Sequence, residues 1–223
     1  MKEILNFTED GFGSVELMNY TRNGDLLVVN AARCSFDKEH GTYDEEKDTR
    51  LINYLAREKH LLPFRHPSAT LRIYAPIFVF RQLGKHQVGF SWSEVSRRYI
   101  SSQPEFWVPD EVRKKADNVK QGSSEETLPT AWIVDFQQQN KSCLHTYNTL
   151  LRAGASPEQA RAVLPQSMYT TCVVTGTLLG WHHLYTQRTE EHTQRETQEY
   201  ARLIGAVMGE LFPRSWEALN ENI

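Results

Sequence analysis

The segment from Ser68 to His86 constrains the fold most, because a strand pattern within it changes directly into a helix pattern. Alternate residues of its first half are apolar and share one face of a strand: Ala69, Leu71, Ile73 and Ala75. Pro76 then suits the first turn of a helix, and the apolar residues 77–80 that follow need a buried position. The segment therefore predicts a strand at 68–76 and a helix at 76–86.

The rest of the chain contains two further strand patterns and several helical ones. Strands are predicted at 14–20 and 168–177, and helices at 26–36, 44–59, 126–153, 156–164, 176–188 and 190–211, with a short surface helix inside 103–126. Asp25 is expected to cap the helix that follows it, and residues 156–159 form a capping-box pattern with Pro157 in the first turn. This order predicts one α+β domain, residues 1–223, with long helices packed on a small, mostly antiparallel sheet.

Composition and charge exclude several classes of protein. A formal net charge of −3 and a pI near 6.2 argue against a dedicated nucleic-acid binder. The cysteines Cys34, Cys143 and Cys172 are scattered without a C-x-x-C pair, which is typical of reduced thiols. No apolar run approaches the roughly 20 residues of a membrane span, and the N-terminus lacks a signal-peptide pattern. We therefore expect an intracellular, cytoplasmic protein that binds neither nucleic acid nor membranes.

The stretch from Lys85 to Tyr99, KHQVGFSWSEVSRRY, is crowded with ionisable and hydroxyl groups and is expected to be an irregular loop. Its serines and its arginines, Arg97 and Arg98, are the groups that bind a phosphate monoester in many proteins. A net-acidic protein needs such a local site to hold an anion. The alternative interpretation is a solvated surface loop.

Three other groups of residues invite a functional reading and have an ordinary alternative. Arg81, Gln82 and Lys85 share a helix face, but basic residues also favour the end of any helix. Arg161 and Arg188 are flanked by apolar residues, as snorkelling or ion-paired arginines are. The adjacent histidines 182 and 183 should point to different helix faces, and neither metal-ligand spacing nor a G-x-S-x-G, P-loop or G-x-G-x-x-G motif is present, so no metal is expected.

The segment RQLGKHQVGFSWSEVSRRY resembles the signature of the flavin-dependent thymidylate synthases, an Arg-His-Arg triplet followed after a short spacer by Ser-x-Arg-Tyr. Ser96, Arg98 and Tyr99 match the second part. Further likenesses, in the family's order, cover nearly the whole chain: AARCSFD, HLLPFRH, APIFVFRQ, ARAVLP, MYTT and QRTEEHTQRETQEYA. The chain departs from the family in that the triplet reads Lys85-His86-Gln87 and the spacer is longer by one residue.

The resemblance implies a homotetramer that holds FAD, shares its active sites between subunits and converts dUMP to dTMP. Methylenetetrahydrofolate would supply the carbon and NADPH would reduce the flavin. By position in the family's motifs, the residues that bind dUMP would be Gln82, Lys85, Glu94, Val95, Ser96, Arg97, Arg98, Arg161 and Arg188. Ser96, Arg98 and Arg161 would surround the phosphate, and Arg188 would be catalytic at the uracil edge, where a fixed cation stabilises negative charge.

The resemblance likewise assigns residues to the cofactor. Those expected to contact the flavin are Lys85, His86, Gln87, Glu94, Thr177 and His183, with His60 and Tyr99 at the folate and ring-stacking positions. Thr177 and His183 stand where the family commonly has asparagines. Because Lys85, Gln87 and Thr177 depart from the family, two alternatives stay open: a deoxyuridylate hydroxymethylase, and a nucleotide- or flavin-binding paralogue without turnover.

Overall fold

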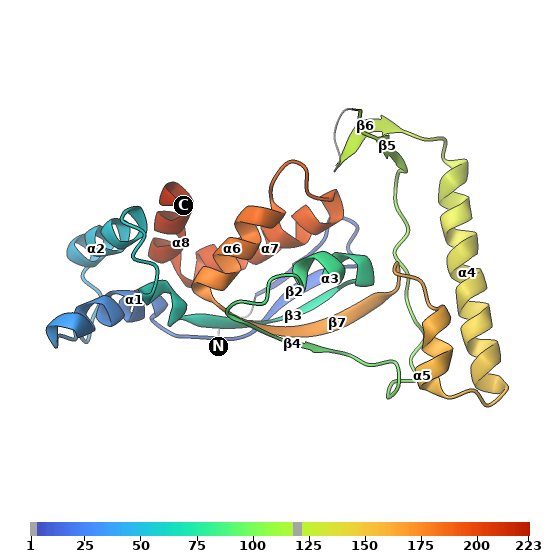
Figure 1. Ribbon diagram of the computed structural model, residues 1–223, viewed down its shortest axis with the longest axis horizontal. Coiled ribbons are helices and arrows are strands. Elements are labelled where there is room, and N and C mark those ends of the chain that lie inside the picture. The colour runs from blue at the N-terminus through green and yellow to red at the C-terminus, as the bar shows by residue number, and fades with distance from the viewer. Residues whose placement is uncertain (1–3, 118–121) are drawn as a thin grey trace.

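The computed structural model describes residues 4–117 and 122–223, and its centre is a five-stranded antiparallel sheet (Figure 1). In spatial order the strands are β1 (Leu5–Phe7), β2 (Ser14–Tyr20), β3 (Ser68–Pro76), β7 (Tyr169–Thr177) and β4 (Phe90–Glu94). The sheet places β3, which leads into α3, beside β7, which leads into α6. Because β3 and β7 are antiparallel, these two junctions lie at opposite ends of the sheet, and the start of β4 lies beside the β7–α6 junction.

The core lies between this sheet and the helices on one side of it, α6 (Leu178–Arg188) and α7 (Arg195–Leu211) (Figure 1). Leu71 and Ile73 of β3 and Val174 of β7 are fully buried. Trp181 of α6 is also fully buried, and its indole N–H donates to the carbonyl oxygen of Ala69 at 3.2 Å. Because the buried indole has this partner, α6 is fixed against β3.

Three helices pack together at one end of the molecule: α1 (Gly24–Arg33), α2 (Glu45–Arg57) and α8 (Pro213–Asn222) (Figure 1). Asp48 of α2 is fully buried and forms an ion pair with Arg33 at the end of α1. Short 3₁₀ turns follow α1 at Cys34–Phe36 and precede β3 at Pro63–Arg65.

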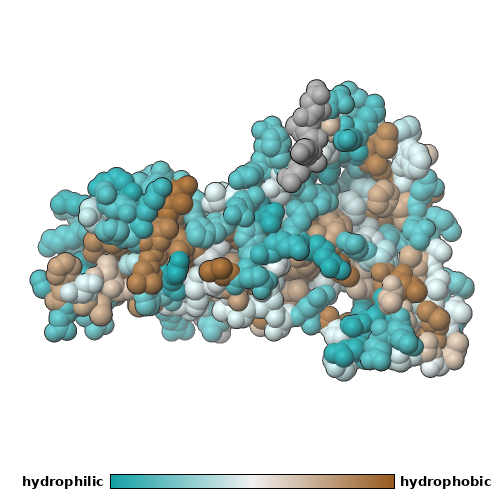
Figure 2. Space-filling view, in the orientation of Figure 1, coloured by the Kyte–Doolittle hydropathy of each residue, from teal (hydrophilic) through white to brown (hydrophobic). Residues whose placement is uncertain are grey.

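The opposite end carries a long helix that has few internal partners, α4 (Ala131–Arg152) (Figure 1). It is joined to the sheet through α5 (Pro157–Ala160) and a 3₁₀ turn at Arg161–Val163, and it follows a two-stranded ribbon, β5 (Arg113–Lys115) and β6 (Ser123–Thr127). Figure 2 shows hydrophobic residues exposed at this end, and Trp132, Val134 and Phe136 are 51%, 61% and 40% exposed. An apolar surface of this kind is typical of a helix that packs against another chain.

The predicted α+β class is confirmed, and the strands expected at 14–20, 68–76 and 168–177 are present. The irregular loop expected at 85–99 is wrong in its middle, because residues 90–94 form the edge strand β4. Its aromatic residues Phe90 and Trp92 alternate with serines and join the core from one face. The alternation of aromatic residues and serines extends over only five residues, and the charged residues around it made the strand hard to recognise from the sequence.

Several predicted helix boundaries are also wrong. The helix expected from residue 126 begins at Ala131, because Pro129 disfavours helical backbone in the residue before it. The surface helix expected inside 103–126 is replaced by β5 and β6 within the described residues, and its part at 118–121 lies outside them. The last long helix begins at Arg195 rather than at residue 190, and Ser156 makes no side-chain cap although Pro157 does open α5.

Asp25 does not cap the helix in which it lies, since Asn23 holds the N-cap position of α1. Its carboxylate instead accepts from the backbone N–H groups of Arg214 at 3.1 Å and Ser215 at 3.0 Å, in the first turn of α8. A negative group at the positive end of α8 is favourable, and it fixes α8 to α1.

Asp25→Ala is expected to lower the free energy of unfolding by about 1–2 kcal/mol, because it leaves both first-turn N–H groups of α8 without this acceptor. Urea denaturation followed by circular dichroism measures the change. Asp25→Asn keeps one acceptor oxygen and should lose less, and equal stability of all three proteins would contradict the capping role.

Within the described residues, no helix combines the length and the apolar character that crossing a bilayer requires.

Candidate active site

A cleft of about 740 Å³ opens beside the C-terminal end of α6. Arg188, the last residue of α6, lines it together with Gln82 of α3 (Ile77–Leu83). Aromatic residues from three separate segments form its apolar wall: Phe78, Trp107 and Phe136. Phe78 and Trp107 meet edge to face with ring centroids 5.0 Å apart. An apolar wall beside an arginine and an amide suits a planar heterocycle with polar edges.

Arg188 is held in one orientation at this cleft. Its Nε donates to Nε2 of His86 at 3.0 Å, so that ring nitrogen must be unprotonated. Burial lowers the pKa of His86 to about 4, and the positive charges of Arg188 and His183 act in the same direction. His86 is therefore a neutral acceptor near pH 7, and the other guanidinium nitrogens of Arg188 have no hydrogen-bond partner among the residues the structure describes.

Gln82 is also fixed by a contact across the cleft. Its amide nitrogen donates to the side-chain oxygen of Gln194 at 2.7 Å, and Gln194 lies at the start of α7. This bond joins α3 to the start of α7, and the bond between Arg188 and His86 joins the end of α6 to the segment that follows α3. Gln194 was not predicted as a site residue, although it stands inside the family-like segment QRTEEHTQRETQEYA.

A second cleft, of about 620 Å³, lies on the other side of α3 and is rich in arginine. Arg81, Arg97 and Arg161 line it, with Glu94 and Val95 at the end of β4. The hydroxyl oxygen of Ser96 accepts from Arg161 Nη1 at 3.3 Å and from Arg98 Nε at 3.4 Å. Two guanidinium groups therefore converge on one serine hydroxyl, an arrangement that suits the binding of a phosphate.

None of these four arginines forms an ion pair within the described part of the chain. Arg97 donates to the carbonyl oxygen of Ser102, and the guanidinium of Arg98 lies 4.9 Å from the ring centre of Tyr99. The ordinary interpretation of Arg161 as an ion-paired helix residue therefore finds no support. An unpaired cluster of cations in a net-acidic protein favours an anionic ligand.

The remaining predicted residues lie outside both clefts. Lys85 and Gln87 follow the end of α3 and are exposed, and the amide of Gln87 donates to the carbonyl oxygen of Gly84 at 2.6 Å. His183 is exposed on α6, and His60 packs edge to face on Tyr54 with centroids 6.0 Å apart. Tyr99 is 77% exposed.

Thr177 has a structural partner of its own. Its hydroxyl oxygen accepts from the backbone N–H of Gly180 at 3.1 Å and so caps α6. It also lies against the turn at Gly89, where a Cβ atom would stand 2.7 Å from it and where φ is +81°. Its contact with a flavin stays a prediction.

The two adjacent histidines of α6 do point to different faces, since His182 is 1% exposed and His183 is exposed. His182 packs edge to face on Trp216 with centroids 5.4 Å apart. No group of three or more histidine, cysteine, aspartate or glutamate residues arranged to hold a metal occurs among the described residues. Cys172 is buried and burial raises the pKa of its thiol to about 12, so it is no thiolate nucleophile near pH 7.

Acid is expected to destabilise the fold through His182. Burial lowers the pKa of His182 to about 4, below the value near 6.5 of an unfolded chain. The unfolded state therefore binds more protons between these values, so the stabilisation is complete above pH 6.5 and is lost as the pH falls toward 4. His182→Gln should reduce the pH slope of the unfolding free energy by about 1.4 kcal/mol per pH unit in this range. Denaturant titrations from pH 7 to 4 measure the slope. The same change at the exposed His145 is the control, and an unaltered slope in His182→Gln would contradict the assignment.

Comparison with known proteins identifies the chain's family. The family model described as "Thymidylate synthase complementing protein" matches residues 16–214. The flavin-dependent thymidylate synthase of Thermotoga neapolitana is 36% identical over 206 residues, which is 92% of this chain and 90% of that protein. That of Streptomyces avermitilis is 35% identical over 229 residues, or 94% and 91% of the two chains.

The chain belongs to the flavin-dependent thymidylate synthase family. It is an enzyme of that family. A solved structure agrees, since a UMP/dUMP methylase, PolB from Streptomyces cacaoi, bound with 5-Br dUMP, superposes with a TM-score of 0.83 at 31% identity. The match covers 94% of this chain and 95% of that one. A second structure of the same methylase, bound with 5-Br UMP, gives a TM-score of 0.82.

Proposed function

We propose that the chain methylates dUMP at C5 of the uracil ring to give dTMP, acting as one domain whose two clefts contribute to composite active sites. The observation that carries the proposal is the convergence of Arg98 and Arg161 on Ser96, without any carboxylate partner among the described residues. A phosphate dianion can accept charge-assisted hydrogen bonds from both guanidinium groups. The names of the relatives support the choice of nucleotide.

In this proposal the residues of the larger cleft act on the uracil. Gln82 orients the ring through its amide, and Arg188 stabilises the negative charge that develops as C5 becomes nucleophilic. The neutral His86 accepts a hydrogen bond from the Nε–H of Arg188, which leaves the terminal guanidinium nitrogens free to face the ring. Because these groups are fixed before the reaction, little reorganisation is needed when the charge develops.

The flavin-dependent names of the relatives imply FAD, and the chemistry of the predicted donor set fits it. Lys85, Gln87 and His183 offer exposed cationic or hydrogen-bonding groups, which suit the phosphates and polar ring edges of a flavin dinucleotide. Methylenetetrahydrofolate is the proposed carbon donor and NADPH the proposed reductant of the flavin, which when bound supplies the hydride that completes the methyl group.

A homotetramer with shared active sites is part of the same proposal. In one chain the two clefts lie on opposite sides of α3, with Gln82 at one and Arg81 at the other. The exposed aromatic residues of α4, Trp132 and Phe136, offer an apolar surface for a second chain. Packing between chains would bring the phosphate cleft of one subunit to the base cleft of another.

The test is the mass of the product formed from dUMP with methylenetetrahydrofolate, NADPH and FAD, with omission of each in turn. dTMP formation that requires every component supports the proposal. The hydroxymethyl product would instead establish the hydroxymethylase, and nucleotide binding without any product would establish a non-catalytic paralogue. UMP is assayed in parallel, because the similar methylase is described for both UMP and dUMP.

A further inference from the structure

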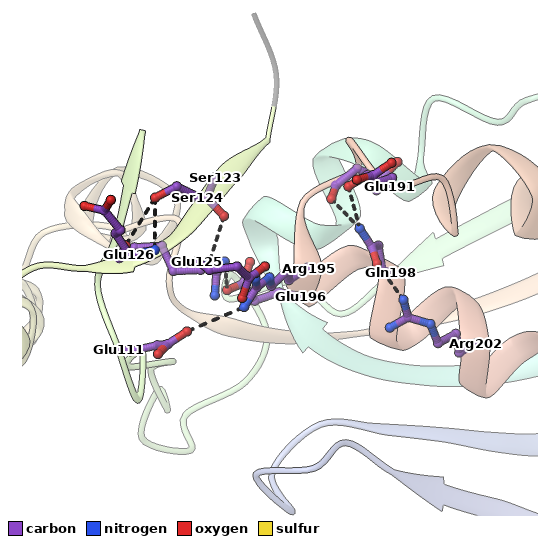
Figure 3. A network of polar contacts seen from close by, with 12 residues as sticks. Glu111, Ser123, Ser124, Glu125, Glu126, Glu191, Arg195, Glu196, Gln198 and Arg202 are labelled. Atoms are coloured by element: carbon purple, nitrogen blue, oxygen red, sulfur yellow. Dashed lines mark hydrogen bonds and ion pairs between the residues drawn. The ribbon is translucent and has the colours of Figure 1, made fainter. Parts of the chain in front are cut away.

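The buried side chain of Gln198 forms hydrogen bonds to the backbone of the segment that joins α6 to α7 (Figure 3). Gln198 lies one turn into α7 and is 7% exposed. Its amide nitrogen donates to the carbonyl oxygens of Glu190 and Glu191, both at 3.2 Å, and of Thr193 at 2.7 Å. One buried amide therefore binds three backbone acceptors of a non-helical segment, of which the carbonyl of Glu190 also accepts from the backbone N–H of Thr193 at 3.0 Å.

The orientation of this amide is determined by a second residue. Arg202, one turn further along α7, donates from Nη2 to the side-chain oxygen of Gln198 at 2.6 Å (Figure 3). Because a guanidinium only donates, the oxygen must face Arg202 and the nitrogen must face the segment. The amide of Gln198 has two N–H groups for three carbonyls. One N–H donates to Thr193, the shortest contact, and the carbonyls of Glu190 and Glu191 share the other.

The segment so held begins directly after Arg188 and ends at Gln194. The hydroxyl of Thr193 donates to the carbonyl oxygen of Gln187 at 3.0 Å, which closes the segment back onto α6. With its carbonyls turned toward Gln198, the segment presents His192 and Gln194 to the larger cleft. Gln194 in turn receives the amide of Gln82.

We propose that Gln198 is a positioning residue, which fixes Arg188 and Gln194 at the larger cleft by binding the carbonyls of residues 190, 191 and 193. The effect of Gln198 on catalysis rests on the proposed function, whereas its effect on the position of Arg188 does not. Without the amide, the carbonyls of Glu191 and Thr193 lose this donor, and the segment of six residues that carries them is free to shift. Displacement of a catalytic cation by about 1 Å can cost about 100-fold in rate.

The test replaces Gln198 by methionine, which keeps the length of the side chain and removes both donors. Gln198→Met is expected to lower kcat for dTMP formation by about 10- to 100-fold, with little change in KM for dUMP because the phosphate cleft is separate. The matched control is Thr197→Val. Thr197 is the preceding residue and fully buried, and its hydroxyl has no hydrogen-bond partner among the described residues, so this change should leave kcat unchanged.

A readout without substrate separates positioning from general damage. The guanidinium of Arg188 is one of the charges that lower the pKa of His86. Burial is the larger cause and stays in place, so in the free protein NMR titration should show a partial rise of the pKa of His86 in Gln198→Met and no change in Thr197→Val. In an Arg188→Ala background, Gln198→Met should have little further effect on kcat, because both changes remove the same contribution, that of a correctly placed Arg188.

The outcomes are distinguishable. If the parent protein forms no dTMP, the proposed function fails, and the His86 titration still decides the role of Gln198. A folded Gln198→Met variant with the parent's His86 titration and rate would overturn the inference. Should that variant not fold, Gln198→Glu replaces it, since an ionised carboxylate accepts from Arg202 but donates to no carbonyl; the same two measurements then support or overturn the role.

Discussion

Replacement of Arg188 by alanine is expected to lower the rate of dTMP formation about 100-fold, as the loss of one oxyanion donor does in other enzymes. Arg188 is the charged group that the structure aligns at the larger cleft through His86, at 3.0 Å. Rapid-quench measurement of dTMP at saturating dUMP isolates the effect on the chemical step. Affinity for dUMP should change much less, because the phosphate is bound in the other cleft.

Arg188→Lys provides the control for charge without geometry. A lysine keeps the positive charge but loses the fork that reaches both His86 and a ligand, so we expect an intermediate rate. An alanine variant with the parent's rate and weakened nucleotide binding would make Arg188 a binding residue only, and would contradict its assignment to the transition state.

The elements of the fold that sequence patterns predicted well are those with a long, uninterrupted period. The strand at Ser68–Pro76 is one, because alternate apolar residues persist over its whole length and Pro76 marks its junction with α3. The edge strand β4 was missed because only Phe90 and Trp92 carry its period. Asp25 was assigned to the wrong helix because a carboxylate caps whichever N-terminus the tertiary fold brings to it, here that of α8.

The sequence predicted which types of residue form the site, but not which of these residues contact one another. Ser96 and Arg161 are 65 residues apart, and His86 and Arg188 are 102 apart, so no local pattern could predict either contact. The family resemblance assigned Ser96, Arg161 and Arg188 to one nucleotide and His86 to the flavin, whereas in a single chain Arg188 lines one cleft and Arg161 lines the other. Lys85 and Tyr99 are exposed in the single chain, so the contacts that the resemblance assigns to them stay predictions.

The same division between clefts predicts how Arg161 contributes. Arg161→Ala should weaken dUMP binding roughly 10- to 100-fold, the usual worth of a charge-assisted hydrogen bond to a phosphate, and should leave the maximal rate nearly unchanged. The reason is that Arg161 reaches the Ser96 hydroxyl on the side of α3 away from Arg188. Calorimetric titration with dUMP measures the loss of affinity.

Binding of deoxyuridine, which lacks the phosphate, distinguishes the loss of a phosphate contact from damage to the fold. If Arg161 binds the phosphate, parent and variant should bind deoxyuridine equally weakly, and the whole difference between them should vanish with the phosphate. Arg50→Ala is the surface control, because Arg50 is exposed on α2 and, within residues 4–117 and 122–223, forms an ion pair only with Glu46. Equal losses of affinity for dUMP and deoxyuridine would show that Arg161 supports the cleft rather than the ligand, and the unpaired arginine cluster would then need another anion to explain it.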